Sequence, residues 1–197
     1  MVTSRGPAWI IIVDGPPCSG KSRVAAALSR RLGLPLLTKD ALKERLFETL
    51  GWGDAERVDD LNRAANALLL DVARLLLATG RPFVLESNLR PDRDGAAYAE
   101  LQQQWGFEAI QLHCSAAPEL LIERFRRRWA AGLRHPGHAD DRTEAAVAER
   151  IRAGVYGPLA LRGPLMRVDT SDAGYVNVER LAASALRQAQ AIEGAAP

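Results

Sequence analysis

Short apolar runs alternate along the chain with longer segments in which apolar residues recur at helical spacing. The short runs predict five β-strands, and the longer segments predict the helices between them. Strands that alternate with helices favour an α/β fold, a parallel sheet with helices on both faces. The predicted strands lie at 9–13, 34–38, 82–86, 109–114 and 165–169. The first two predicted helices end at Gly33 and Gly51. The later predicted helices occupy about 58–79, 94–104, 118–131, 144–153 and 177–191.

The longest predicted helix, at about 58–79, is amphipathic and should pack one side against the sheet. Gly80 is expected to end it, since glycine readily adopts the left-handed conformation that closes many helices. We expect the last residues, after 191, to be frayed. The predicted inner face of the long helix carries Leu61, Ala65, Leu68, Leu69, Val72, Leu75 and Leu76.

A glycine-rich motif follows the first predicted strand and precedes the first predicted helix. Its letters are G-x-x-x-x-G-K-S, the pattern of a phosphate-binding P-loop, and strand, loop and helix stand in the required order. In such a loop, backbone N–H groups cradle the phosphates, Lys21 reaches the terminal phosphates and the Ser22 hydroxyl holds Mg²⁺. The predicted nucleotide-binding residues here are Gly15, Pro16, Pro17, Cys18, Ser19, Gly20, Lys21, Ser22 and Arg23.

Composition limits the other possibilities. With 197 residues, of which 47% are apolar, the chain suits a single domain, 1–197. Its net charge of +2, from 26 basic and 24 acidic residues, gives no strong reason to bind nucleic acid or an anionic membrane. The two cysteines, Cys18 and Cys114, form neither a metal pattern nor a disulfide framework. No signal peptide or membrane span is evident, so we expect a cytoplasmic protein, a monomer or a homodimer.

Polar residues follow several predicted strands at their carboxyl ends, where ligands bind in parallel α/β sheets. They are Asp40, Glu86, Ser115 and the segment 170–172. Phosphoryl transfer needs a carboxylate that orients the attacking oxygen, and Asp40 follows the second predicted strand, at this edge of the sheet. The alternative is that Asp40 only caps its helix.

The segment 132–143 has no apolar periodicity, and with its flanks it predicts a mobile lid at about 124–145. Before it, Arg124, Arg127 and Arg128 are predicted along one side of a helix, where guanidinium groups would neutralise transition-state charge. The alternative is a solvated face on which Glu123 pairs with Arg127. Of these arginines, Arg124 and Arg128 are the two that we predict to contact the transferred phosphate. We read the histidines at 135 and 138, which flank a Pro-Gly turn, as lid geometry rather than a metal site.

Several classes of P-loop protein lack support. The sequence has no N-K-x-D motif of a switch GTPase, no apolar strand ending in Asp-Glu as in ring-forming ATPases, and no transporter signature. A small phosphotransferase with an arginine-rich lid remains.

The chain then resembles the P-loop small-molecule kinases related to chloramphenicol phosphotransferase, zeta toxin and phage polynucleotide kinase. The resemblance implies that Asp40 is the general base and that Lys43 faces the same cleft. Residues 86–90, Glu-Ser-Asn-Leu-Arg, are similar to the zeta-type segment Glu-x-Thr-x-Arg, with asparagine in place of threonine. Glu86 would then hold a Mg²⁺-bound water or a substrate hydroxyl. The predicted acceptor-binding residues are Asp40, Lys43, Glu86, Asn88, Arg90 and Arg134.

These observations predict a kinase with a P-loop fold that moves the γ-phosphate of ATP or GTP to a hydroxyl of a small molecule, with Mg²⁺ as cofactor. The resemblance favours an antibiotic, nucleoside or sugar-like alcohol as acceptor. Arg124 and Thr170 are expected beside the nucleotide, near its base. A polynucleotide 5′-end kinase is one alternative, against which the near-neutral charge argues. A nucleotide-binding regulatory or toxin-like module is the other.

Overall fold

The strands form one parallel five-stranded sheet in the order β2-β3-β1-β4-β5. The computed structural model describes residues 7–53, 55–138, 140–172 and 176–195. The strands are β1 (Trp9–Asp14), β2 (Leu36–Thr38), β3 (Val84–Glu86), β4 (Glu108–Ser115) and β5 (Leu165–Asp169). The helices are α1 (Lys21–Leu32), α2 (Lys39–Leu50), α3 (Ala55–Ala78), α4 (Pro91–Trp105), α5 (Pro118–Ala130), α6 (Asp140–Arg152) and α7 (Val178–Ala195), with a 3-10 turn at Pro136–His138.

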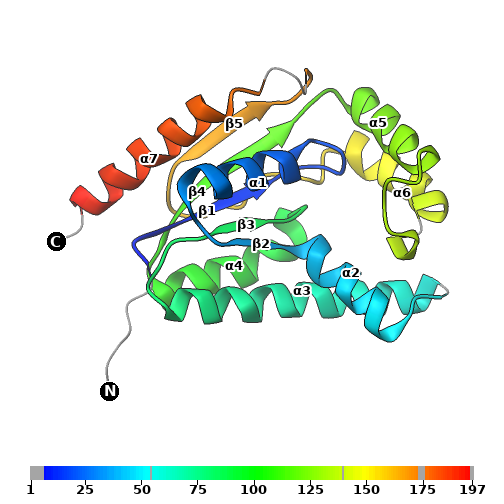
Figure 1. Cartoon of the computed structure of the whole chain (residues 1–197), viewed down its shortest axis with the longest axis horizontal. Coiled ribbons are helices and arrows are strands. Elements are labelled where there is room, and N and C mark those ends of the chain that lie inside the picture. The colour runs from blue at the N-terminus through cyan, green and yellow to red at the C-terminus, as the bar shows by residue number, and fades with distance from the viewer. Residues whose placement is uncertain (1–6, 54, 139, 173–175, 196–197) are drawn as a thin grey trace.

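Helices cover both faces of the sheet, as predicted (Figure 1). β1 is buried along its whole length, and its side chains alternate between the two faces. Ile11 and Val13 pack with residues of α1 and α7 in one core, whereas Ile10 and Ile12 pack with residues of α3 and α4 in the other. The central position of β1 therefore places the loop that follows it in the middle of the sheet's carboxyl edge.

The buried stripe of α3 differs from the predicted one. Leu68 and Leu75 are 39% and 70% exposed, while Ala73 and Leu77 are buried. Besides Val58, the buried apolar residues of α3 recur every four positions, at Leu61, Ala65, Leu69, Ala73 and Leu77. The helix carries more apolar residues than one face can bury, so the pattern did not indicate which leucines would face the sheet.

Four helices have ends that differ by three or more residues from those predicted. α3 begins at Ala55 rather than near 58. α4 begins at Pro91, where the missing N–H of proline costs nothing, and an Asp94 oxygen accepts a hydrogen bond from the Arg90 N–H at 2.8 Å. α6 begins at Asp140 rather than near 144. α7 continues to Ala195, so residues 192–195 are helical rather than frayed as expected, and residues 196–197 lie outside the described residues.

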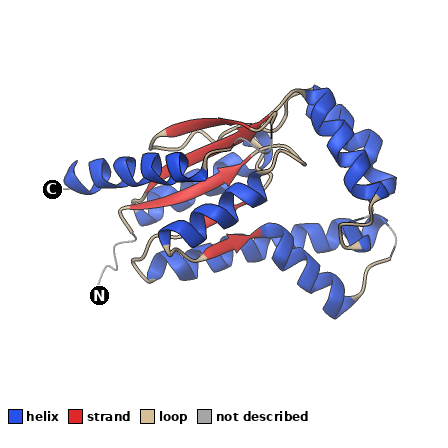
Figure 2. Ribbon diagram, turned by 45° about the horizontal axis from the view of Figure 1, so that its top comes forward, coloured by secondary structure: helices blue, strands red, loops and turns tan. Residues whose placement is uncertain are grey.

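The predicted lid contains helical structure on both sides of its turn. α5 and α6 pack together over their own small core, which includes Leu121, Ile122 and Ile151. The pair lies beyond the carboxyl ends of the strands, opposite α2 (Figure 2). This arrangement covers the edge of the sheet where the P-loop lies. The mobility of the lid stays a prediction.

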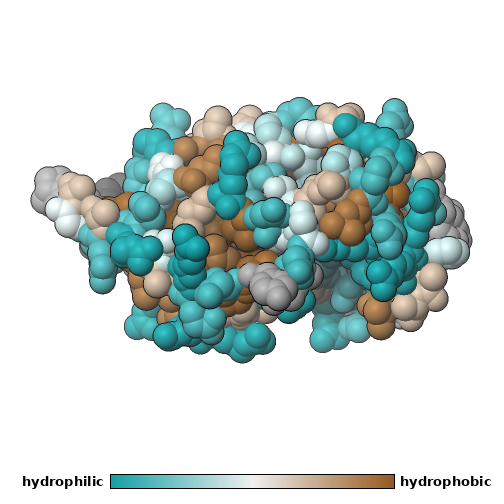
Figure 3. Space-filling view, turned by 90° about the horizontal axis from the view of Figure 1, so that it is seen from above, coloured by the Kyte–Doolittle hydropathy of each residue, from teal (hydrophilic) through white to brown (hydrophobic). Residues whose placement is uncertain are grey.

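Polar side chains are spread over the face shown in Figure 3, with smaller apolar areas between them. Within the described ranges, no helix combines the length and the hydropathy that a membrane crossing would require.

Candidate active site

The P-loop leaves β1 through a backbone conformation that requires glycine. Gly15 has φ +143°, and a Cβ atom at this position would lie 2.2 Å from the carbonyl oxygen of Cys114 on β4. Gly20 precedes α1 with φ +76°, and Cys18 also has a positive φ, +62°. The loop therefore runs tightly against the neighbouring strand before it enters the helix, whose first N–H groups are available for an anion.

Replacing Gly15 by alanine is expected to destabilise the protein by about 2–4 kcal/mol, because the methyl group overlaps the backbone of β4 and φ is unfavourable for an L-residue. Gly33→Ala is the matched control. Gly33 also has a positive φ, +65°, but open space around its Cβ position, so about 1 kcal/mol is expected. Urea unfolding monitored by circular dichroism measures both values. Equal losses in the two variants would contradict the proposed clash.

Lys21, Ser22 and Glu86 come together at the start of α1. The parallel register pairs Val13 of β1 with Glu86 of β3, which places this carboxylate beside the loop. The Ser22 hydroxyl donates to Glu86 Oε1 at 3.2 Å, and Lys21 Nζ lies 3.9 Å from the same oxygen. Lys21 Nζ also donates to the Pro16 carbonyl at 3.3 Å. Burial raises the pKa of Glu86, and Lys21 opposes this rise.

The pair of Ser22 and Glu86 suits Mg²⁺. Both offer oxygen ligands, which Mg²⁺ prefers, and the ion commonly takes only one or two protein ligands beside phosphate oxygens and water. Among the described residues no group of three or more His, Cys, Asp or Glu side chains is placed to hold a metal. Ser22 would hold the ion directly, and Glu86 would hold it or its water.

Asp40 lies in the first turn of α2, immediately after β2. It is not the cap of this helix: the cap is Thr38, whose hydroxyl accepts the Ala41 N–H at 3.2 Å. The capping alternative is therefore wrong for Asp40, whose carboxylate lines the pocket. Asp40 Oδ2 accepts a hydrogen bond from Arg134 Nη2 at 2.7 Å. Burial alone would raise the pKa of Asp40, but the surrounding cations, foremost Arg134, lower it below its ordinary value.

The arginines of α5 separate into two groups. Arg124 and Arg128 line the pocket, one helical turn apart. Arg124 also donates to the carbonyl oxygens of Thr170 and Ser171, at 2.9 and 2.7 Å, and so ties α5 to the loop after β5. The side chain of Arg127 is 78% exposed and lies 3.6 Å from Glu123. This pair matches the alternative of a solvated helix face. Of the three predicted arginines, Arg127 therefore does not line the pocket.

The lid contacts α2 through aromatic and histidine side chains. His135 stacks on Phe47 with ring centroids 5.2 Å apart, and His138 Nε2 lies 3.0 Å from Glu44 Oε1. A Cβ atom on Gly137 would lie 2.7 Å from the Phe47 ring, so the turn packs closely here. Burial and Arg134 lower the pKa of His138 to about 3. These contacts bring Arg134 over Asp40.

A buried acid–imidazole pair lies under the P-loop. Asp14 at the end of β1 is paired in register with His113 of β4, and Asp14 Oδ1 lies 2.5 Å from His113 Nδ1. Asp14 is fully buried, and its second oxygen has no hydrogen-bond partner among the described residues. Burial raises the pKa of Asp14, and His113 opposes this rise. Sequence reasoning did not pair these residues, because only the order of strands brings them together.

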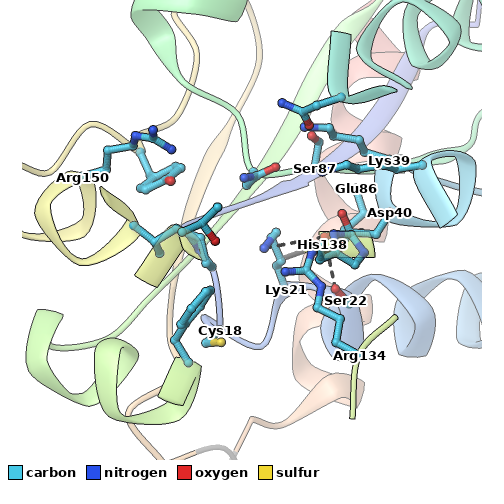
Figure 4. A pocket seen from close by; sticks show the side chains of 18 of the residues that line it. Cys18, Lys21, Ser22, Lys39, Asp40, Glu86, Ser87, Arg134, His138 and Arg150 are labelled. Carbon is cyan, nitrogen blue, oxygen red and sulfur yellow. Dashed lines mark hydrogen bonds and ion pairs between the residues drawn. The ribbon is translucent and has the colours of Figure 1, made fainter. Parts of the chain in front are cut away.

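One pocket of about 460 Å³ is bordered by Lys21, Ser22, Asp40, Glu86 and Arg134 (Figure 4). Its described lining includes ten lysine and arginine side chains but only three carboxylates, which favours a highly anionic ligand. Most of the predicted site residues line it: Pro17, Cys18, Gly20, Lys21, Ser22, Arg23, Asp40, Lys43, Glu86, Asn88, Arg90, Arg124, Arg128 and Arg134.

Four predicted residues do not border the pocket. Gly15, Pro16 and Ser19 shape the loop beneath it. The Thr170 hydroxyl donates to the Ser115 carbonyl at 3.0 Å, which joins the ends of β4 and β5. Sequence reasoning missed several lining residues, which no motif marks: Lys39, Ser87, Arg93, Arg150 and Tyr156.

Comparisons with solved structures support the P-loop kinase fold. The structure of a putative kinase from Chloroflexus aurantiacus J-10-fl matches with a TM-score of 0.84 and 37% identity, over 93% of this chain and 99% of that one. A gluconokinase from Sinorhizobium meliloti 1021 matches with a TM-score of 0.53 and 21% identity, over 93% and 99% of the two chains. A shikimate kinase from Bacteroides thetaiotaomicron matches with a TM-score of 0.52 and 16% identity, over 91% and 96%. The last two show the fold alone.

The comparison with curated proteins gave no significant match. The family model described as an AAA domain matches residues 10–157, a range that contains the P-loop, Asp40, Glu86 and the α5–α6 pair. The chain therefore belongs to the AAA domain family and has the fold of the P-loop kinases.

Proposed function

We propose that the protein is a kinase that transfers the γ-phosphate of ATP or GTP to a hydroxyl group of a small molecule. The observation that carries this proposal is the position of Asp40 in the same pocket as Lys21 and Ser22, with Arg124, Arg128 and Arg134 on the lid side. Phosphoryl transfer depends mainly on positioning and charge stabilisation, and this pocket offers both.

The binding end of the pocket is built around the P-loop. The N–H groups at the start of α1 and the Lys21 ammonium would hold the β- and γ-phosphates. Ser22 and Glu86 would hold Mg²⁺, which would supply positive charge to offset that of the phosphates when it is bound. Arg124 and Arg128 would face the phosphates from α5. Arg124 is already oriented by its bonds to the loop after β5.

At the other end, Asp40 would orient the acceptor hydroxyl and accept its proton. The acceptor oxygen forms a bond to the γ-phosphorus while the bond from that phosphorus to the β–γ bridging oxygen breaks, and the nucleoside diphosphate leaves. The lowered pKa keeps Asp40 ionised at neutral pH. Arg134, which here pairs with Asp40, would turn to the transferred phosphate once the acceptor hydroxyl takes its place.

The test is label transfer from γ-³²P-ATP and γ-³²P-GTP, with Mg²⁺, to hydroxylated antibiotics, nucleosides, sugars, sugar acids and oligonucleotides with free 5′-hydroxyl ends. Label on a small molecule is the expected result and identifies the acceptor class, including whether it is an antibiotic. Label only on oligonucleotides would replace this function by end phosphorylation. Tight nucleotide binding without any labelled acceptor would favour a regulatory module.

A further inference from the structure

Lys39 is a buried ammonium group that no described side chain or carbonyl neutralises. It is 4% exposed, lines the pocket, and makes no hydrogen bond or ion pair with any described residue. The other two lysines differ: Lys21 contacts Pro16 and Glu86, and Lys43 lies over the Phe47 ring. An unpaired buried charge is costly, so a site that keeps one is suited to a ligand of opposite charge.

Ser87 is a second buried polar group without a partner, and it lies beside Lys39. It is 2% exposed, lines the same pocket, and its hydroxyl has no hydrogen-bond partner among the described residues. The register between β2 and β3 pairs Thr38 with Glu86, so the next residues along the two strands, Lys39 and Ser87, are neighbours. Figure 4 shows both close to Glu86 at one side of the pocket.

The charges around Lys39 also favour an anion. Burial, together with the neighbouring cations Arg93 and Lys43, lowers the pKa of Lys39 to about 8, against smaller opposing effects of Asp40 and Asp94. Arg93 already forms an ion pair with Asp94 at 2.7 Å. The Asp94 carboxylate is therefore not available to neutralise the Lys39 charge by itself. The surroundings therefore destabilise the ammonium form, and a bound anion would restore it.

The place of Lys39 in the fold separates its ammonium group from the proposed triphosphate site. β3 lies between β2 and β1, so Lys39 at the end of β2 is about 10 Å across the sheet from the end of β1, where the P-loop begins. Lys39 is next to Asp40 in the chain and thus on the acceptor side of the pocket.

We propose that Lys39 and Ser87 form an anion subsite, and that the acceptor carries a carboxylate or phosphate group in addition to the hydroxyl that is phosphorylated. The ammonium would donate to the anion and neutralise it, and the Ser87 hydroxyl would donate a second hydrogen bond. Binding at this subsite would hold the acceptor hydroxyl beside Asp40. The role of the anion as part of an acceptor depends on the proposed kinase function, but the anion subsite itself does not.

Binding of small anions tests the subsite without any turnover. The protein is first saturated with Mg²⁺ and AMP-PNP, so that the P-loop is filled, and is then titrated with inorganic phosphate or acetate by calorimetry at pH 7. Wild type is expected to bind at least one of them. Lys39→Met should weaken that binding at least tenfold, whereas Lys43→Met, which removes the same charge from the same pocket, should weaken it less than threefold. Preference for phosphate or for acetate identifies the anionic group.

Two results would overturn the proposal: no anion binding by nucleotide-saturated wild type, or equal weakening by Lys39→Met and Lys43→Met. Neither result bears on label transfer, so failure of the subsite and failure of the kinase proposal are distinguishable. If the acceptor panel gives a product, the charged acceptor should exceed its uncharged analogue in kcat/KM at least tenfold, and Lys39→Met should remove this preference.

Thermal melting of Lys39→Met shows whether the variant folds, and the pH dependence of its melting temperature tests whether Lys39 is an unpaired buried charge. The folded-state pKa of Lys39, about 8, lies below its ordinary value of 10.5, so its destabilising effect is fully present below pH 8 and is lost as pH rises toward 10.5. Without anion, Lys39→Met should melt at a higher temperature than wild type at pH 7, and the difference should shrink by pH 10. A lower melting temperature at pH 7 would mean that Lys39 has a structural partner and would overturn the proposal.

Discussion

Replacement of Asp40 by asparagine is expected to lower the kcat of phosphoryl transfer by about 10²–10⁴-fold, because an amide cannot accept the proton of the attacking hydroxyl. The Kd of Mg²⁺-ATP should change less than about threefold, since Asp40 lies in the first turn of α2 and not in the P-loop. Steady-state label transfer gives kcat, and titration with a fluorescent nucleotide gives Kd. Asparagine keeps the size of the side chain, so the pocket should keep its shape.

The ion pair between Asp40 and Arg134 requires a control, because Asp40→Asn also weakens this contact of the lid. Arg134→Ala removes the same contact from the other side and keeps the carboxylate. Arg134→Ala also removes the charge that Arg134 would bring to the transferred phosphate, so its loss of kcat is an upper limit on what the contact contributes. We expect the loss of kcat in Asp40→Asn to be at least tenfold larger. Near-normal turnover in Asp40→Asn would refute the proposed mechanism.

Lys21→Met is expected to lower kcat/KM by about 10²–10³-fold and to weaken nucleotide binding as well. The ammonium is mostly buried, with 13% of the side chain exposed, and lies beside Glu86 at the start of α1, where the terminal phosphates would sit. Methionine fills similar volume without the charge. The same kinetic and binding measurements apply, so the two variants are compared directly: Asp40→Asn should affect kcat alone, and Lys21→Met should affect both.

Arg23→Met is the matched control for Lys21→Met. Arg23 also lines the pocket but is exposed, so loss of its charge should change nucleotide affinity by less than about fivefold. If Arg23→Met weakened binding as much as Lys21→Met, the effect would come from the overall charge of the pocket and not from a specific phosphate contact. That outcome would contradict the assigned role of Lys21.

The order of elements and the P-loop could be predicted because each depends on residues close together in the chain. An apolar run, a glycine-rich loop and a helical pattern in succession predict a strand, a phosphate-binding turn and a helix, and the structure contains all three. Asp40 was identified because it follows the second predicted strand and because the chain resembles kinases in which a base stands at this position. The ends of α4, α6 and α7 were less predictable, because helix ends depend on single caps and on packing.

The sequence by itself determined the fold class, the phosphate-binding loop and a carboxylate after the second strand, because local periodicity and spacing encode them. Only the tertiary structure decided which distant side chains meet. Asp14 and His113 are 99 residues apart and Asp40 and Arg134 are 94 apart, whereas Lys39 and Ser87 are neighbours only because β2 pairs with β3. Strand order and register set these contacts, and both depend on the packing of the whole sheet rather than on any short segment.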